Sequence, residues 1–436
     1  MSKSREILIY VSELNNRIYF LFRHVFFRIM GIRPVFTNDK EAFLNCTTPK
    51  LNYSANRFAD ELYIKPQGLL YEKGIKRIPI KVGQYKNLPV FFFNDEQSDF
   101  PFDIFSAIFY LLTRYEEYLP YSPDRYERFQ PKESIAFHHN FLDEPIVERW
   151  VDLFKDFLKP RFTDFNYAQH SFQYIPTIDV DIAFAFRHRG ILLGAVLFIR
   201  DLLKGNILNF FDRLKVVSRL SSDPYDNFDF LQQCLNDSDK KPIFFFQVGK
   251  RGKFDKNISI KNNTIKKIVY KTKQFAEIGL HPSFASNKKF SSLEHEKDNL
   301  EFVFQKPLTK SRQHYIKLYF PRTFQNLLKI CITEDYSMGY PDFNGFRAGT
   351  CTPYNFYDLT KEKETDLKIY PFQVIDASFK TYLKLSPEEA EKKILELRDK
   401  VKSVHGTFII IWHNDTFAST VEGEKWRTIF LNLLKD

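Results

Sequence analysis

The chain has 436 residues and a formal net charge of +10, with 44% hydrophobic and 27% charged residues. Only 15 Gly and 21 Pro are present, which excludes a disordered or collagen-like chain, and the length predicts two domains with separate cores. The positive charge suits an anionic partner, but no recognisable nucleic-acid-reading motif accompanies it, so no nucleic acid is expected.

The start of the chain and its cysteines predict a reducing compartment. Residues 1–17 lack the apolar stretch and cleavage site of a signal peptide. The longest apolar run, Ile191 to Ile199, is far shorter than the ~18 residues that a membrane span needs. Four widely separated cysteines form no C-x-x-C pair, against a zinc module or a disulfide framework: Cys46, Cys234, Cys331 and Cys351. We expect a cytoplasmic protein, able to touch the inner membrane peripherally.

Residues 1–165 predict a small accessory α/β domain. The expected elements are strands at Ile7–Val11, Arg33–Thr37, Glu61–Ile64 and Leu88–Phe93, and helices at Arg17–Met30 and Asp103–Tyr115. No catalytic spacing occurs in this part, so its role stays open.

From Tyr174 onward, short apolar strands alternate with helical segments, which is typical of βα units in a parallel sheet. The expected strands are Tyr174–Asp179, Pro242–Val248, Glu277–His281, His314–Tyr319, Cys331–Asp335, Asn344–Arg347, Phe372–Asp376 and Thr407–Trp412. The clearest helices are Thr264–Phe275, Leu293–Phe304 and Pro387–Val404.

A basic helical insertion, at about 182–235, separates the first two of these strands. Its cations lie among Leu, Ile, Val and Phe: Arg187, His188, Arg189, Arg200, Lys204, Arg213, Lys215 and Arg219. Such a segment can lie on an anionic membrane surface. Helices that cover the sheet with their basic faces in water are the favoured alternative.

Polar residues at the ends of apolar strands are the first functional candidates, because these ends converge on one rim of a parallel barrel. Asp179 and Asp181 end the first strand, and such a pair can divide labour between binding a divalent metal and accepting a proton. A D-x-D pair also occurs at helix N-caps and at nucleotide-sugar metal sites. His281 ends the third strand and offers an imidazole ligand.

Two later motifs add candidates. Arg347, in G-F-R-A-G-T, can hold one carboxylate ionised and oriented. His413 follows four apolar residues and Trp412, where it is placed to protonate a leaving group.

The order T-x-D-x-D, G-x-H, F-R-x-G and W-H resembles the polysaccharide deacetylase family (carbohydrate esterase family four, NodB-like), over about Ile175 to Phe417. The chain also resembles a bacterial subgroup in which an uncharacterised N-terminal domain precedes a barrel with H-P-S-x-x-S and G-F-R-A-G-T-C-x-P. The resemblance implies an α/β fold, with an irregular seven- or eight-stranded (β/α) barrel at 170–436 after the smaller N-terminal domain.

The resemblance also implies roles for single residues. It makes Asp179 the catalytic base, tethered by Arg347, and His413 the catalytic acid, supported by Asp376. Asp181 and His281 become metal ligands. Trp412 becomes the lining of an acetyl pocket, and Tyr354 is a further substrate-binding candidate.

One departure from the family pattern concerns the metal. The second metal histidine normally follows the first by four residues, where this chain has Ala285. Two ligands hold a catalytic metal poorly. His314 would restore a carboxylate with two imidazoles, although its place at the start of a predicted strand counts against it, and Asp335 is a weaker substitute.

The resulting hypothesis is a metal-dependent hydrolase, using Zn or Co, that removes N-acetyl groups from a sugar or glycan precursor. An alternative is a catalytically silent, deacetylase-like protein that binds carbohydrate or acts as a scaffold. A third, a nucleotide-sugar transferase using Asp179 and Asp181, leaves His281 and His413 without a role.

Overall fold

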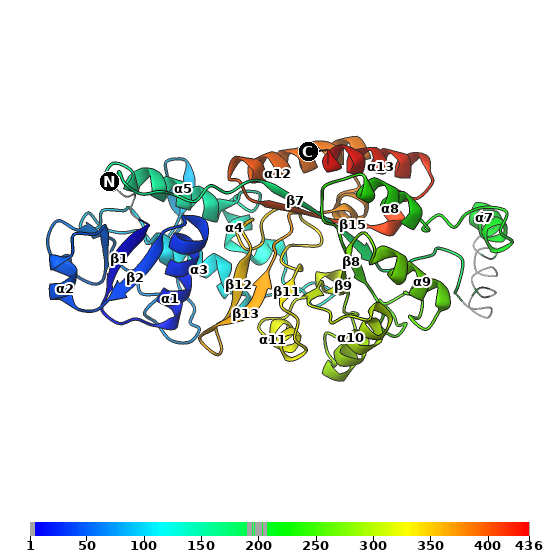
Figure 1. The fold of residues 1–436 in the computed structure, drawn as a ribbon, viewed down its shortest axis with the longest axis horizontal. Helices are drawn as coiled ribbons and strands as arrows, with labels where there is room; N and C mark the ends of the chain where they lie inside the picture. Colours follow the sequence, from blue (N-terminus) through cyan, green and yellow to red (C-terminus); the bar gives the residue numbers. More distant parts are fainter. Residues whose placement is uncertain (1–4, 190–193, 195, 197–202, 204–206, 436) are drawn as a thin grey trace.

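A computed structural model describes residues 5–189, 194, 196, 203 and 207–435 of the chain. The described residues form a mixed α/β structure organised by two sheets, a smaller one near the N-terminus and a larger one in the rest of the chain (Figure 1). No helix in these ranges has the length and apolar character required to cross a membrane. Arg200, Lys204 and most of the apolar run 191–199 lie outside the described residues.

The smaller sheet has the strand order β2-β1-β3-β4, and all its pairs are parallel. Its strands are β1 (Glu6–Val11), β2 (Arg33–Thr37), β3 (Lys50–Tyr53) and β4 (Leu62–Tyr63). The helix expected at Arg17–Met30 is divided into an α-helix and a π-helix. The expected strand at Leu88–Phe93 contributes instead to a separate antiparallel hairpin of β5 (Gly83–Tyr85) and β6 (Leu88–Val90).

Aromatic side chains pack the helices of this region against its sheet. The rings of Phe22 and Phe105 stack with centroids 4.1 Å apart, which joins the first helix to the third. The helices are α1 (Asn16–Phe22), η1 (Arg23–Ile29), α2 (Lys40–Asn45), α3 (Ile104–Leu112), η2 (Tyr115–Tyr118), η3 (Pro131–Glu133), α4 (Ile135–His138) and α5 (Ile146–Leu158).

The larger sheet has the order β12-β13-β11-β10-β9-β8-β7-β15-β14 and is parallel except for the β12–β13 hairpin. Its strands are β7 (Gln173–Val180), β8 (Ile243–Phe246), β9 (Glu277–Leu280), β10 (Lys310–Ser311), β11 (Glu334–Asp335), β12 (Tyr354–Asp358), β13 (Lys363–Ile369), β14 (Val374–Ile375) and β15 (Thr407–His413). Ten helices of the described residues accompany it: α7 (Ile207–Val217), α8 (Phe228–Asn236), α9 (Asn263–Thr272), α10 (Phe290–Phe304), η4 (His314–Ile316), α11 (Arg322–Lys329), η5 (Ser378–Leu383), α12 (Pro387–Ser403), η6 (Asn414–Phe417) and α13 (Val421–Leu434). Figure 1 shows α12 and α13 on one side of this sheet, with α10 and α11 on the opposite side.

The larger sheet curls so that its parallel edges approach each other. Only residues 370–373 link β13, the outermost strand of the parallel part of the sheet on one side, to β14 at the opposite edge. This link is hydrogen-bonded on both sides, since Tyr370 N donates to Asp335 O (2.8 Å) and Gln373 N donates to Ile409 O (3.1 Å). A four-residue connection is too short to bridge the edges of a flat sheet of this width, so the strands surround an interior.

Alternation along the strands decides which side chains fill this interior. An apolar cluster forms there from Ile243, Phe245, Ile316, Tyr336, Phe372, Ile375, Ile409 and Ile411. The Phe245 ring occupies space left by Gly279, where an added Cβ would lie 2.4 Å from it. Because side chains two residues apart share a face, the polar residues that end β7, β9 and β15 point the same way as this cluster.

Two expected strands are wrong. β10 ends at Ser311, so His314 follows a strand end instead of beginning a strand, and it lies in the short 3₁₀ helix η4 (His314–Ile316). Asn344–Arg347 forms turns between β11 and β12. The hairpin of β12 and β13 was not expected from the sequence, because its strands carry mixed polar and apolar residues.

Buried ion pairs join the two regions of the chain. Glu117 accepts hydrogen bonds at Oε1 from Nε of Arg114 (2.7 Å) and from Nε of Arg347 (2.8 Å). Nη1 of Arg114 also donates to the main-chain oxygen of Arg347. All three side chains are buried. One continuous apolar cluster extends from the smaller sheet to the outer face of the larger one.

Candidate metal centre

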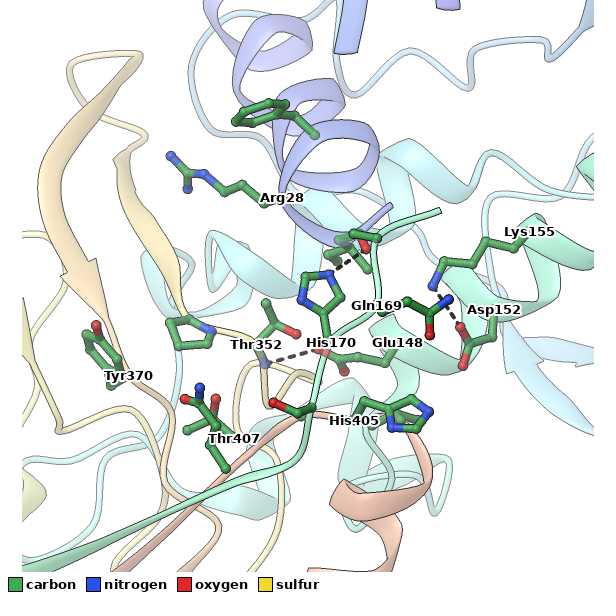
Figure 2. Close-up of a pocket in the computed structure, with 18 of the residues that line it drawn as sticks. Arg28, Glu148, Asp152, Lys155, Gln169, His170, Thr352, Tyr370, His405 and Thr407 are labelled. Carbon is green, nitrogen blue, oxygen red and sulfur yellow. Dashed lines mark hydrogen bonds and ion pairs between the residues drawn. The ribbon is translucent and has the colours of Figure 1, made fainter. Parts of the chain in front are cut away.

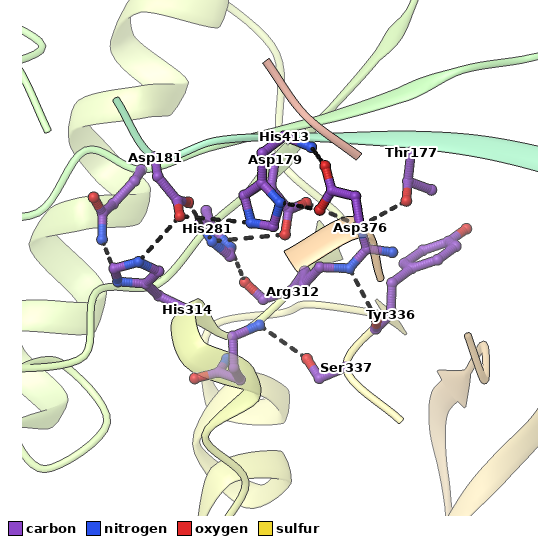
Figure 3. A network of polar contacts seen from close by, with 12 residues as sticks. Thr177, Asp179, Asp181, His281, Arg312, His314, Tyr336, Ser337, Asp376 and His413 are labelled. Carbon is purple, nitrogen blue, oxygen red and sulfur yellow. Dashed lines mark hydrogen bonds and ion pairs between the residues drawn. The ribbon is translucent and has the colours of Figure 1, made fainter. Parts of the chain in front are cut away.

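The carboxyl ends of β7, β9 and β15 gather two carboxylates and two imidazoles at one end of the curled sheet (Figure 3). β7 and β15 are neighbours, and their register places His413 opposite Asp179. Asp181 directly follows β7, and His281 directly follows β9. The convergence of strand ends therefore brings together residues of different strands that are 100 or more positions apart in sequence.

Asp181, His281 and His314 form the compact part of this group, with ligand atoms that all lie within 4.8 Å of one another. Nε2 of His281 lies 2.9 Å from Oδ1 of Asp181, and Nε2 of His314 lies 3.3 Å from Oδ2. Burial alone would raise the pKa of Asp181, but the two imidazoles outweigh it and lower this pKa well below 3.8.

The hydrogen-bond partners of the two imidazoles test whether this group fits a cation. Nδ1 of His281 donates to the main-chain oxygen of Arg312 (2.5 Å), and Nδ1 of His314 donates to Oδ1 of Asp255 (2.9 Å). Each ring therefore turns Nε2 toward Asp181, whose buried Oδ1 receives no hydrogen bond from the described residues. One carboxylate and two oriented imidazoles suit a divalent metal of the Zn or Co type.

His314 has a further property that bears on cation binding. Burial opposes its protonated form, but Asp181 and then Asp255 raise the pKa of His314 to about 9. A cation at this group has to compete with that proton, so metal affinity depends on pH.

Asp179 is buried beside the metal-type group and is held by an arginine that the sequence did not identify. Its Oδ1 accepts from Nη1 of Arg312 (2.9 Å), while Oδ2 lies 3.8 Å from Nε2 of His281. Arg312 also donates to Thr177 Oγ1 (2.7 Å). The expectation that Arg347 tethers Asp179 is wrong, because Arg347 pairs with Glu117 (Nη2 to Oε2, 2.5 Å).

His413 and Asp376 form a hydrogen-bonded pair on the other side of Asp181. Nδ1 of His413 lies 2.6 Å from Oδ1 of Asp376, whose Oδ2 accepts from the His413 main-chain N–H (2.8 Å) and from Thr416 Oγ1. Nε2 of His413 lies 3.7 Å from Oδ2 of Asp181. Burial would lower the pKa of His413, but Asp376, followed by Asp181 and Asp179, raises it well above 6.5.

A cavity of about 220 Å³ opens onto His413 and Asp181, and we call it the catalytic cavity. It is lined by Asp181, Ile182, Asp376, Ala377, Lys380, Thr381, His413, Asn414, Asp415 and Thr416. The arrangement leaves one carboxylate and one imidazole, Asp179 and His413, free of the metal-type group but close to it. Such a pair can accept a proton at one point and donate one at another.

Three sequence-based candidates lie elsewhere. Trp412 is fully buried on the outer face of the sheet, with its ring 5.7 Å from that of Phe430, so the expectation that it lines an acetyl pocket is wrong. Tyr354 is buried in β12 beside His24 and does not line the catalytic cavity. Asp335 accepts hydrogen bonds from Ser311 and Ser337 and is not part of the metal-type group.

Sequence reasoning missed Arg312 and Asp255. Arg312 lies two residues before His314, on the strand connection whose boundaries were misplaced, so its inward direction was not apparent. Asp255 lies in the loop after β8 and also accepts from Gln247 Nε2 (2.8 Å) and from Phe284 N (2.8 Å). No local spacing connects it to His314, which is 59 positions later.

A larger cavity, of about 780 Å³, lies at the opposite end of β7 and β15, near their first residues Gln173 and Thr407 (Figure 2). Figure 2 shows Glu148, His170 and Tyr370 around it. It contains none of the residues of the metal-type group. The carboxylates and imidazoles that converge at the strand ends therefore lie at the catalytic cavity and not at this larger one.

Residues 7–163 match a family of unknown function, DUF7033. No curated protein matches the chain.

Several solved structures are distantly similar to this chain. A protein from Mycobacterium smegmatis, provisionally described as a polysaccharide deacetylase, is 12% identical, with a TM-score of 0.41 over 61% of this chain and 85% of its own. A polysaccharide deacetylase from Bacillus cereus is 10% identical, with a TM-score of 0.29 over 61% and 86%. A family-four pseudoenzyme from Bacillus anthracis is 10% identical, with a TM-score of 0.31 over 60% of each chain. Such distant likenesses leave the function to be argued from the site itself.

Proposed function

We propose that the protein is a metal-dependent hydrolase that removes N-acetyl groups from a sugar or glycan precursor. The observation that carries this proposal is the convergence of Asp181, His281 and His314, with Asp179 and His413 beside them. We further propose that the curled sheet is an irregular seven- or eight-stranded barrel of the deacetylase type, occupying 170–436, and that residues 1–165 form an accessory domain.

Each group of residues has its own role in this reaction. Asp181, His281 and His314 would hold a divalent cation, which would supply Lewis-acid polarisation of the acetyl carbonyl and of water. Arg312 fixes Oδ1 of Asp179, so Oδ2 is the oxygen that accepts a proton from the attacking water. Asp376 holds Nδ1 of His413, which leaves Nε2 to donate a proton to the departing amine nitrogen. The products are acetate and the free amine.

The direct test is acetate release by the purified protein, supplied with Zn or Co, from N-acetylglucosamine oligomers and from nucleotide- or lipid-linked N-acetyl sugars. Asp179→Asn and His413→Ala are expected to lower kcat by about 100-fold or more, since each removes a proton-transfer group. Asp298→Asn, an exposed carboxylate on α10, is the matched control. Equal acetate release by all variants would show that the assigned roles are wrong.

Metal content separates this function from a catalytically silent, carbohydrate-binding protein. We expect about one equivalent of Zn or Co per chain after loading and dialysis, and its loss in His281→Ala. Absence of bound metal together with absence of acetate release would favour the silent alternative. The hypothesis of a nucleotide-sugar transferase gives His281 and His413 no role. Their position beside Asp179 and Asp181 therefore argues against it.

A further inference from the structure

A second polar cavity borders the catalytic one, and we call it the basic cavity. Its volume is about 850 Å³, and it is formed by the segments that follow β7, β8 and β15 together with α7. It shares Ile182 with the catalytic cavity, and Ala418 on its wall is two residues beyond Thr416 on the wall of the other. A substrate in the catalytic cavity can therefore extend into the basic cavity.

Positive charge predominates on this wall. The charged side chains that line it are four cations and one carboxylate: Arg189, Arg213, Arg251, Lys256 and Asp212. Asp223, which lies nearby, accepts hydrogen bonds from the main-chain N–H groups of Ala185 (2.7 Å), Phe186 (2.8 Å) and Arg187 (2.9 Å). These bonds hold Asp223 in a main-chain turn, and its negative charge acts on Arg189 but offsets only part of the positive charge on this wall.

Arg189 and Arg251 carry positive charge that is unfavourable for the protein when no ligand is bound. Across the described ranges, neither has a carboxylate at ion-pair distance. Nη2 of Arg189 donates to Phe184 O (2.9 Å), but its buried Nε has no partner among the described residues. Burial first, and then repulsion by Arg251, lowers the pKa of Arg189. Like charges held together in a partly buried cavity indicate an anionic ligand.

The other groups on the wall favour phosphate over a single carboxylate. Ser221, Ser222, Ser419 and Thr420 line the cavity with hydroxyl groups. Thr420 is the N-cap of α13, so the positive end of a 14-residue helix adjoins the cavity. One guanidinium group can bind two phosphate oxygens at once, so Arg189 and Arg251 suit a diphosphate.

We infer that the basic cavity binds a phosphate or diphosphate group carried by the same N-acetylated sugar whose acetyl group reaches the catalytic cavity. The part of this inference that concerns the N-acetylated sugar rests on the proposed function. Such a diphosphate group is carried both by a soluble nucleotide diphosphate sugar and by a lipid-linked diphosphate sugar.

The first experiment measures anion binding without catalysis. Pyrophosphate is titrated into metal-loaded protein by calorimetry, and Arg251→Gln and Arg189→Gln are each expected to weaken its binding by about tenfold. Arg251 is exposed, so its variant keeps the fold even where the Arg189 variant does not. Lys306→Gln removes an equal charge from an exposed site outside the cavity and is expected to bind as the unmodified protein does. No pyrophosphate binding, or equal binding by all four proteins, overturns the inference.

The second experiment compares acetate release from a neutral N-acetylglucosamine oligomer, from uridine diphosphate N-acetylglucosamine and from vesicles carrying polyprenyl diphosphate N-acetylglucosamine. The Arg251 variant is expected to lose about tenfold in kcat/KM on one diphosphate substrate and none on the neutral oligomer. The substrate that shows the loss identifies the source of the phosphate.

The two experiments separate the two ideas. Acetate release that is equal for neutral and phosphorylated sugars, and unchanged in the arginine variants, overturns the phosphate site and leaves the hydrolase in place. Pyrophosphate binding that the arginine variants lose, without acetate release from any substrate, supports the phosphate site and removes the proposed hydrolase.

Discussion

Asp255 orients His314, although it belongs to a different loop. Its Oδ1 accepts from Nδ1 of His314 (2.9 Å), and its carboxylate also accepts from the main chain at Phe284 (2.8 Å). The imidazole is therefore fixed with Nε2 toward Asp181. A carboxylate behind a metal histidine typically sets both the ring orientation and the basicity of the ligand.

Asp255→Asn is expected to lower Zn affinity by about 10- to 100-fold, because the amide holds the ring less firmly and makes it less basic. Competition against a chromophoric chelator measures this affinity. Asp298→Asn, on an exposed position, is expected to leave it unchanged. Unaltered affinity in the Asp255 variant would mean that His314 is not a ligand.

Arg347 and Arg312 show the limit of assigning the partner of an arginine from a sequence motif. Arg347 and Arg312 are both buried, and both pair with a carboxylate. The F-R-x-G pattern predicted the wrong one, because a local motif does not state which carboxylate a long side chain reaches. The residues of β7, β9 and β15 were correctly expected to meet, since strand ends in a parallel sheet converge whatever the loops between them do.

At the scale of a strand, Gly279 determines how β9 packs. Gly279→Ala would place a Cβ 2.4 Å from the Phe245 ring, which lies on the neighbouring strand. We expect a loss of about 1–3 kcal/mol in the free energy of unfolding, from overpacking in a closed interior. Zn affinity is expected to fall as well, because His281 is only two residues away.

Urea unfolding and chelator competition check this pair of effects. The control is Gly252→Ala, where the nearest atom to the added Cβ is 3.9 Å away and little change is expected. A Gly279→Ala protein with unchanged stability would contradict the packing described here.

The π-helix η1 buries His24 completely, with neither ring nitrogen hydrogen-bonded to any described residue. Burial, helped by Arg28, lowers the pKa of His24 from 6.5 to about 3. Between these values the unfolded chain binds a proton that the folded protein does not, so stability falls as pH decreases below about 6.5. The slope from this one residue is about 1.4 kcal/mol per pH unit.

His24→Leu is expected to reduce the pH dependence of stability by that slope between pH 6 and pH 4. Free energies of unfolding in urea at several pH values measure it, with the exposed His295→Leu as the reference. Parallel curves for His24→Leu and the unmodified protein would contradict the assignment.

Elements with strong apolar character were predictable, and short polar ones were not. Strands form at Thr407–Trp412 and Tyr174–Asp179, as expected, because runs of apolar residues are buried within a sheet. β10 has two residues and the β12–β13 hairpin alternates irregularly, so neither carries the periodicity on which such predictions depend. The misplaced boundary at β10 is the reason that His314 seemed poorly positioned.

Across the whole molecule, Glu117 joins the N-terminal region to the larger sheet. Burial opposes its ionised form, but Arg347 and Arg114 outweigh it and lower the pKa of Glu117. Glu117→Gln would leave the buried guanidinium of Arg347 without a carboxylate among the described residues, while Arg114 would keep its ion pair with Glu116. We expect a loss of about 3–5 kcal/mol in the free energy of unfolding.

The same contacts predict that the chain unfolds as one unit. Near-UV circular dichroism and the fluorescence of the three tryptophans, Trp150 in the first region and Trp412 and Trp426 in the second, are expected to report coincident transitions. Glu96→Gln, at an exposed position, is the control for Glu117→Gln. Two separate transitions in the unmodified protein would show that the regions are energetically independent.

The pairing of β7 with β15 has a consequence for synthesis on the ribosome. The two strands lie side by side, but His413 follows Asp179 by 234 positions (413 − 179). At the usual elongation rate, the nascent chain waits about 10–50 s between the two. During that interval β7 exposes an unpaired apolar edge, which is a target for chaperones, and no partial product contains both Asp179 and His413.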